Sequence, residues 1–210
     1  MGETCTQYMF IFEEDLGKPG YEGAKFVCSP PMRTPKDAAA LWKALANNTL
    51  QAVSTDHCPF WYEGGVNGRI GGKELGKAGF DKIPNGVPGI EDRMPVMWEH
   101  GVNQGRLSAN RFVEITSTNP AKIFGLYPRK GVIAIGADAD IVLWDPTKEH
   151  TISAQTHHMR TDYNLYEGMT VHGWPERVLL RGKTIVQGDQ WLGQQGTGQF
   201  LRRSPHAEVL

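Results

Sequence analysis

An amphipathic helix that leads directly into a short apolar strand is the feature that most constrains the fold of this chain. Thr34-Pro35 has the form of an N-cap followed by the first helical residue, and apolar side chains then recur at helical spacing as far as Ala46. Asn47-Asn48 ends this helix, and residues 50–54 follow as a strand. Two shorter apolar runs upstream, at residues 8–12 and 25–28, are interpreted as further strands.

The order strand, helix, strand favours an α/β fold in which helices pack outside a parallel sheet. In such folds the ligand site lies beyond the carboxyl ends of the strands. Asp56 comes just after the strand at residues 50–54. The pattern therefore predicts that Asp56 lies where a ligand site is expected.

The remainder of the chain predicts a second layer of different character. Residues 61–89 read as a glycine-rich loop, and helices are expected from Ile90, after Ser108, and from Asn119-Pro120 to Gly125. Short apolar segments separated by turn residues then predict a small antiparallel β layer, with strands at residues 132–135, 139–144, 177–180 and 184–186. We expect three units: residues 1–125, residues 126–192, and a polar tail at residues 193–210.

Composition excludes several classes of function. The formal net charge of the 210 residues is -1, so no basic surplus is available for a nucleic acid or an anionic membrane. The apolar runs are much shorter than the roughly 20 residues that span a bilayer, and no secretory signal is apparent. The three cysteines form no CxxC pair, which favours reduced thiols in a cytoplasmic protein.

Three short segments contain candidate site residues, and each has a structural alternative. Asp56 and His57 suit Zn²⁺ or a similar cation; the structural alternative, which the local sequence alone favours, is that Asp56 caps a helix or turn with His57 packed behind it. Ser29 precedes two prolines that hold its polar groups in a fixed direction, which suits a planar amide or simply a rigid exit from a strand. Asn85-Gly86 lies between two prolines and would present backbone groups to a ligand or form a tight turn.

A complete metal site cannot be assembled from recognisable spacing in this sequence. A catalytic zinc takes about three protein ligands and keeps one open position. The seven histidines form neither an HxH pair nor the i, i+4 pair of a helical zinc site. Adjacent His157 and His158 are expected to be surface or structural residues.

Segments along nearly the whole chain, taken in order, resemble the C-terminal portion of dihydropyrimidinases and bacterial D-hydantoinases, which are members of the amidohydrolase superfamily. The matching segments are Gly2-Glu-Thr-Cys-Thr-Gln-Tyr8, Phe26-Val-Cys-Ser-Pro-Pro-Met-Arg33, Ser54-Thr-Asp-His-Cys-Pro-Phe60, Ile83-Pro-Asn-Gly-Val-Pro-Gly-Ile-Glu-Asp-Arg-Met94, Thr116-Ser-Thr-Asn-Pro-Ala-Lys-Ile-Phe-Gly125, Tyr127-Pro-Arg-Lys-Gly131 and Gly136-Ala-Asp-Ala-Asp-Ile-Val-Leu-Trp-Asp-Pro146.

This resemblance implies a fold and an activity. Residues 1–125 would be the C-terminal part of a (β/α)₈ TIM-type barrel, residues 126–192 part of a small β-sandwich, and residues 193–210 an arm used in the subunit contacts of a homotetramer. The implied reaction belongs to pyrimidine degradation: a hydroxide activated by a binuclear Zn²⁺ centre opens the ring amide of a dihydropyrimidine or hydantoin and gives an N-carbamoyl amino acid. Asp56 would be the last metal ligand and the proton acceptor. Ser29 would bind the cyclic imide, and the backbone of Asn85 would contact the ring.

The chain also departs from the family. The HxH pair, the carboxylated lysine and two further histidine ligands are absent, and a full barrel takes about 250 residues. We therefore expect the isolated chain to be inactive. Collapsin response mediator proteins, which are non-enzymatic scaffolds, are an alternative, but Asp56 and Asn85 favour enzyme ancestry. Dihydroorotases and allantoinases have a similar Asp-His pair, whereas Cys28-Ser-Pro-Pro31 and Ile83-Pro-Asn-Gly86 point away from them.

Overall fold

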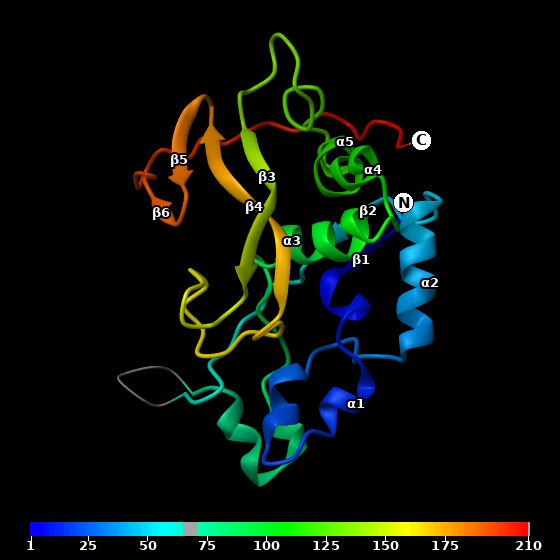
Figure 1. The fold of residues 1–210 in the computed structure, drawn as a ribbon, viewed down its shortest axis with the longest axis vertical. Coiled ribbons are helices and arrows are strands. Elements are labelled where there is room, and N and C mark those ends of the chain that lie inside the picture. Colours follow the sequence, from blue (N-terminus) through cyan, green and yellow to red (C-terminus); the bar gives the residue numbers. More distant parts are fainter. Residues whose placement is uncertain (65–70, 210) are drawn as a thin grey trace.

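Two β-sheets organise the chain in the computed structural model, which describes residues 1–64 and 71–209 (Figure 1). The strands are β1 (Glu3–Cys5), β2 (Ala52–Ser54), β3 (Ile141–Thr151), β4 (Thr170–Leu180), β5 (Lys183–Gln187) and β6 (Gln190–Trp191). The α-helices are α1 (Glu13–Leu16), α2 (Pro35–Ala46), α3 (Arg93–Met97), α4 (Ala109–Val113) and α5 (Asn119–Ile123). Short 3₁₀ helices are η1 (Thr6–Met9), η2 (Glu22–Phe26), η3 (Lys73–Ala78) and η4 (Phe80–Lys82), and π-helical turns are η5 (Trp98–Asn103) and η6 (Glu114–Thr118).

The predicted strand–helix–strand unit is present, with β1 as its first strand. β1 and β2 pair in parallel, Thr4 opposite Val53, and α2 connects them in the chain. The start of α2 is confirmed, because the Thr34 hydroxyl accepts the Asp37 amide while the Asp37 carboxylate accepts the Thr34 amide. Asp56 follows the carboxyl end of β2, as expected.

The two upstream strand predictions are wrong. Residues 8–12 fall in η1 and the turn after it, because Met9 packs into one hydrophobic core and Ile11 into the other. A short apolar run of this kind cannot be assigned to a strand by periodicity alone. Residues 25–28 lie at the end of η2, where Lys25 forms an ion pair with Glu22 one helical turn earlier.

The expected helical block between the sheets is confirmed in outline. α3 begins at Arg93 and continues into η5, with Met97 fully buried on its inner face. Ser108 caps α4 by accepting the Arg111 amide at 3.1 Å. The helix expected from Asn119 is not separate, since η6 connects it without a break to α4.

The antiparallel β layer is confirmed as one sheet in the order β3-β4-β5-β6. The predicted strand at residues 132–135 is wrong: these residues form bends and turns, and Ile133 and Ile135 are exposed. Gly131 and Gly136 flank the segment with positive φ angles of 78° and 94°, which interrupt an extended backbone.

Two hydrophobic cores hold these elements together. One lies between α2, β2 and the helical block and is built around Trp42, Leu45, Val53, Met97 and Phe112. The other core joins the N-terminal third of the chain to β4 and to the residues that precede β4. In it, Ile11, Phe26 and Cys28 pack with residues such as Ile152, Tyr166 and Trp174. The units predicted at residues 1–125 and 126–192 therefore share a core, and their boundary remains a prediction. Within the described part of the chain, no helix has the length and apolarity needed to cross a membrane.

The described part of the tail, residues 193–209, runs back from β6 toward the end of α5 (Figure 1). The Ser204 amide donates to the Gly125 carbonyl, and the Ala207 amide donates to the Lys122 carbonyl. The tail thus packs on its own chain near α5.

Candidate functional site

Asp56 lies two residues beyond β2 and is exposed. Its backbone has a φ of 46°, an uncommon conformation for a residue other than glycine. Among the described residues, no hydrogen bond or ion pair engages its carboxylate. An exposed, unengaged carboxylate at the end of a parallel strand is available to a ligand.

Backbone hydrogen bonds join the three segments that contain the predicted site residues. The Cys58 amide, two residues after Asp56, donates to the Val87 carbonyl at 3.1 Å. The Gly86 amide, next to Asn85, donates to the Val27 carbonyl at 3.1 Å, two residues before Ser29. Ser29, Asp56 and Asn85 are all exposed. The structure therefore brings the three segments together and leaves all three side chains accessible.

Gly86 makes this close approach possible. Its φ is 144°, and a Cβ atom at this position would lie 2.3 Å from the carbonyl oxygen of Cys58. A side chain would separate the segment of Asn85 from the segment of Asp56. No tight turn forms at Asn85-Gly86; this irregular segment instead lies against the segment of Asp56.

His57 fixes the same loop from the other side. Its Nδ1 accepts hydrogen bonds from the amides of Gly89 and Ile90, at 3.2 and 3.4 Å. Burial lowers the pKa of His57, which favours the neutral imidazole that accepts at Nδ1. His57 therefore packs behind Asp56, as the structural alternative expected. The two amide hydrogen bonds occupy its Nδ1 atom.

One thiol and one phenol contact the segment of Ser29, and a second thiol contacts the strand that precedes Asp56. The Cys28 thiol and the Tyr8 hydroxyl both donate to the Pro30 carbonyl, at 3.3 and 3.0 Å. The Cys5 sulfur lies 3.1 Å from the Ser54 hydroxyl. Burial raises the pKa of both thiols, and the negative charge of Asp56 adds to this shift, so they stay protonated and weakly nucleophilic. These groups position the backbone and are not candidate nucleophiles.

Lys73 is a residue of this region that sequence reasoning missed. Its side chain is fully buried, and its Nζ donates to the carbonyls of Val27 and Pro84 at 2.9 and 3.0 Å. A lysine in a glycine-rich stretch without periodicity is ordinarily exposed. Nothing in the local sequence distinguished Lys73 from such a residue.

The described residues do not form a complete set of metal ligands. No group of three or more His, Cys, Asp or Glu side chains in residues 1–64 and 71–209 is arranged to hold a metal. Asp56, exposed and unengaged, fits one ligand position. It does not by itself make a catalytic zinc site, which takes three protein ligands.

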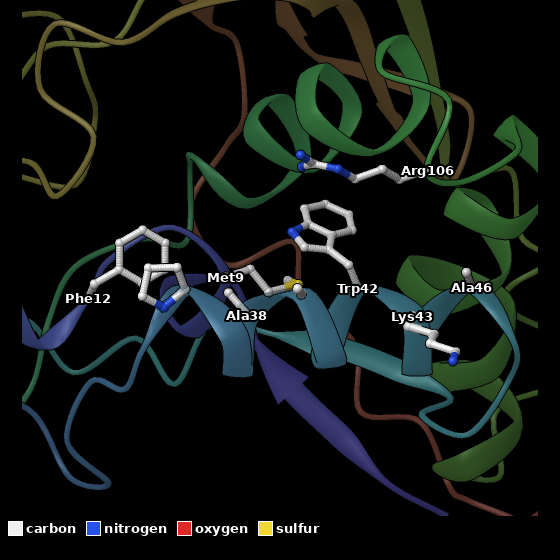
Figure 2. A pocket seen from close by; sticks show the side chains of 9 residues that line it. Met9, Phe12, Ala38, Trp42, Lys43, Ala46 and Arg106 are labelled. Atoms are coloured by element: carbon white, nitrogen blue, oxygen red, sulfur yellow. The ribbon is translucent and has the colours of Figure 1, made fainter.

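A hollow of about 430 Å³ lies elsewhere, along α2 beside Met9, Phe12 and Arg106 (Figure 2). It is lined by Met9, Phe12, Pro35, Ala38, Ala39, Trp42, Lys43, Ala46 and Arg106. The Arg106 guanidinium lies over the Trp42 ring, 5.2 Å from its centroid. None of Ser29, Asp56 and Asn85 lines this hollow, so it is separate from the candidate site.

Comparisons with known proteins agree on one family. The model of the amidohydrolase family matches residues 13–185. The D-hydantoinase of Geobacillus stearothermophilus is 48% identical over 209 residues, which cover 100% of this chain and 43% of that protein. The dihydropyrimidinase of Rattus norvegicus is 44% identical, with 100% and 38% covered.

Solved structures give the same result. The crystal structure of dihydropyrimidinase from Brevibacillus agri NCHU1002 superposes with a TM-score of 0.93 at 51% identity, covering 99% of this chain and 44% of that one. The chain thus spans less than half the length of the relatives it matches. It belongs to the amidohydrolase family and is similar along its whole length to D-hydantoinases and dihydropyrimidinases.

Proposed function

We propose that this chain supplies part of an active site that hydrolyses the ring amide of hydantoins or dihydropyrimidines to N-carbamoyl amino acids. The names of its relatives support this substrate class. One observation carries the proposal: two backbone hydrogen bonds hold the segments of Asp56, Asn85 and Ser29 together. The Cys58 amide donates to the Val87 carbonyl, and the Gly86 amide donates to the Val27 carbonyl. The relatives are enzymes by name, which disfavours a non-enzymatic scaffold.

Each of the three residues has a role that its surroundings allow. The Asp56 carboxylate accepts a proton from the attacking water and passes it to the ring nitrogen that leaves. Ser29 binds the imide through its exposed polar groups. The Asn85 side chain donates to the Ile83 carbonyl at 3.2 Å, and the role proposed for Asn85 is contact of its backbone with the ring.

A metal centre belongs to this proposal. Amidohydrolases generally use metal ions, and Asp56 would be one ligand of a binuclear zinc centre whose other ligands come from outside this chain. When bound, such ions supply water activated as a nucleophile near neutral pH. Tight binding of zinc by this chain alone is not expected.

The wider arrangement is proposed on the same resemblance. β1 and β2 would lie in a (β/α)₈ barrel, β3–β6 in a β-sandwich, and residues 193–210 in an arm at the interface of a cytoplasmic homotetramer. The parallel pairing of β1 with β2 and the antiparallel order of β3–β6 support the first two assignments.

A hybrid enzyme tests the function. Residues 1–210 would replace the matching segment of the Geobacillus stearothermophilus D-hydantoinase, to which they are 48% identical. We expect the hybrid to hydrolyse hydantoin or dihydrouracil. Asp56→Ala should lower kcat/KM about a thousandfold, since a positioned acid–base group contributes 10² to 10⁴.

Asp81→Ala is the matched control, because Asp81 is an exposed aspartate on η4. It should leave hydrolysis unchanged. Full activity in a folded Asp56→Ala hybrid would refute the role of Asp56. A folded, zinc-loaded hybrid that hydrolyses neither substrate would refute the proposed function.

A further inference from the structure

A buried lysine lies directly beneath the two segments proposed to contact the substrate. Lys73 is 0% exposed, and its Nζ donates to the Val27 carbonyl and the Pro84 carbonyl. Val27 is two residues before Ser29, and Pro84 immediately precedes Asn85. One ammonium group therefore bridges the backbones that carry both residues.

The Val27 carbonyl is the centre of this junction. It accepts from the Gly86 amide at 3.1 Å and from the Lys73 ammonium at 2.9 Å. The Pro84 carbonyl accepts from the same ammonium at 3.0 Å. Because Gly86 follows Asn85, the lysine and the amide hold the two segments at adjacent points.

The lysine itself is held firmly. Its backbone amide donates to the Trp61 carbonyl at 2.8 Å, and its carbonyl accepts the Tyr21 hydroxyl. Glu74, the next residue, accepts the Gly72 amide and so closes the start of η3. The position of Nζ is thus fixed by contacts on both sides of Lys73.

A buried cation is costly, and no carboxylate offsets this one: within the described chain its hydrogen bonds go to carbonyl groups. Burial lowers the pKa of Lys73 to about 8, although the nearby thiols of Cys28 and Cys58 oppose that shift. A residue needed only to fill space would be apolar at this depth. The free-energy cost of burying this ammonium group is explained if the carbonyls of Val27 and Pro84 must be held at a fixed distance from each other.

We infer that Lys73 is a positioning residue of the proposed site, and that it sets the spacing of Ser29 and Asn85 by binding the carbonyls of Val27 and Pro84. This inference rests on the proposed function for the identity of the substrate. It does not require Lys73 to touch the substrate. η3, which begins at Lys73, would thus support the two segments that contact the substrate.

Amide hydrogen exchange in the 210-residue chain tests the junction without any assay of activity. In Lys73→Met, exchange at the Gly86 amide should accelerate about tenfold relative to the unmodified chain, as expected when charge-assisted hydrogen bonds are lost. Exchange at the Phe112 amide, which donates to the Ser108 carbonyl at 2.9 Å in α4, should not change. Lys73→Arg, which keeps the charge and the donors, should restore most of the protection.

Lys77→Met is the matched control, since Lys77 is an exposed lysine of the same helix η3. Equal protection of Gly86 in the Lys73→Met and Lys77→Met chains would overturn the inference. Should Lys73→Met fail to fold, Lys73→Gln takes its place. Its shorter neutral amide should still accelerate exchange at Gly86, and unchanged exchange there would likewise overturn the inference.

A binding measurement separates positioning from mere stability. Dihydrouracil, titrated against the chain by NMR, should shift the amide signals of Ser29 and Asn85. Lys73→Met should weaken this binding several-fold, and the loss should be smaller in a Ser29→Ala background because both changes act on one contact. Full additivity would overturn the inference. If dihydrouracil binds neither the unmodified chain nor the hybrid enzyme, that result counts against the proposed function, and exchange at Gly86 alone decides the role of Lys73.

Discussion

Gly86 is the residue on which the junction of the site depends most directly. With φ at 144° and a Cβ position 2.3 Å from the Cys58 carbonyl, Gly86→Ala would strain the backbone and push the two segments apart. We expect a loss of about 2 kcal/mol in the free energy of unfolding, typical of a residue forced into a sparsely populated conformation. Urea denaturation of the 210-residue chain measures it.

Gly89→Ala is the control for this prediction. Gly89 belongs to the same loop, yet a Cβ there would meet no atom within 4 Å and its φ lies outside the left-handed region. The alanine should be tolerated with little change. Equal losses for the two variants would show that the loop, and not the approach to Cys58, sets the requirement for glycine.

Asp92 gives a pH-dependent prediction at the same scale. It is buried, and the Asn164 amide donates to both of its oxygens at 3.2 and 3.0 Å. Burial raises its pKa from 3.8 to about 7, and the charges of Glu91 and Glu167 add to the shift. A carboxyl group with a raised pKa stabilises the fold below about pH 4, and this contribution is lost as the pH rises through about 7.

Asp92→Asn mimics the protonated acid and should remove this pH dependence. Between about pH 4 and pH 8 the Tm of the unmodified chain should fall relative to that of the variant. The exposed-site variant Asp81→Asn should show no such difference. Parallel Tm profiles for Asp92→Asn and the unmodified chain would mean that Asp92 is ionised in the folded protein across this range.

The sequence predicts candidate site residues but not the residues that support them. Asp56, Ser29 and Asn85 stand out because they lie in distinctive short segments, and the structure brings those segments together. Lys73 could not be found in the same way, because its environment is created by segments some 46 and 11 residues away along the chain. Burial of a lone charged residue is a tertiary property that local patterns do not encode.

At the scale of elements, Arg111 joins α4 to the end of α2 and to the approach to β2. Its Nε donates to the Leu45 carbonyl at 2.7 Å, and one terminal nitrogen donates to the Leu50 carbonyl at 2.9 Å. The other terminal nitrogen pairs with Glu114 at 2.7 Å. The guanidinium therefore holds the turn that brings the chain from α2 into the strand leading to Asp56.

Arg111→Met should lower the free energy of unfolding by about 3 kcal/mol, since buried carbonyls lose donors from a charged group. Arg106→Met is the control: Arg106 is exposed and contacts the Trp42 ring, so its loss should cost about 1 kcal/mol or less. Chemical denaturation compares the two. Equal losses would show that the contacts of Arg111 contribute no more than a surface cation.

Element prediction succeeded where several local signals agreed and failed at short apolar runs, such as residues 8–12, that lacked a second signal. α2 combines helical spacing with a capping box, and both are visible in the sequence. The apolar run at residues 8–12 became a turn because Met9 and Ile11 belong to different cores. β1, at Glu3–Cys5, was missed because three residues of mixed polarity carry no periodic signal, and it is defined only by its pairing with β2.

At the scale of the whole molecule, the two hydrophobic cores leave large apolar side chains exposed. Phe80 is 87% exposed, Ile133 84% and Phe200 90%. Covering apolar side chains with another protein segment removes them from water, which is favourable. The isolated chain should consequently be less stable than the hybrid enzyme that contains it, which calorimetry of both would measure.

The metal content of the isolated chain is the sharpest prediction at this scale. Tight zinc binding takes about three protein ligands, whereas the described residues present Asp56 without a second and third partner. Purified chain dialysed after loading with zinc should therefore retain far less than one ion per molecule and should hydrolyse neither hydantoin nor dihydrouracil. The hybrid enzyme, treated identically, should keep its metal, and Asp56→Ala should reduce the amount retained. Stoichiometric zinc together with turnover in the isolated chain would contradict this prediction. It would show that residues of this chain complete the metal site beside Asp56.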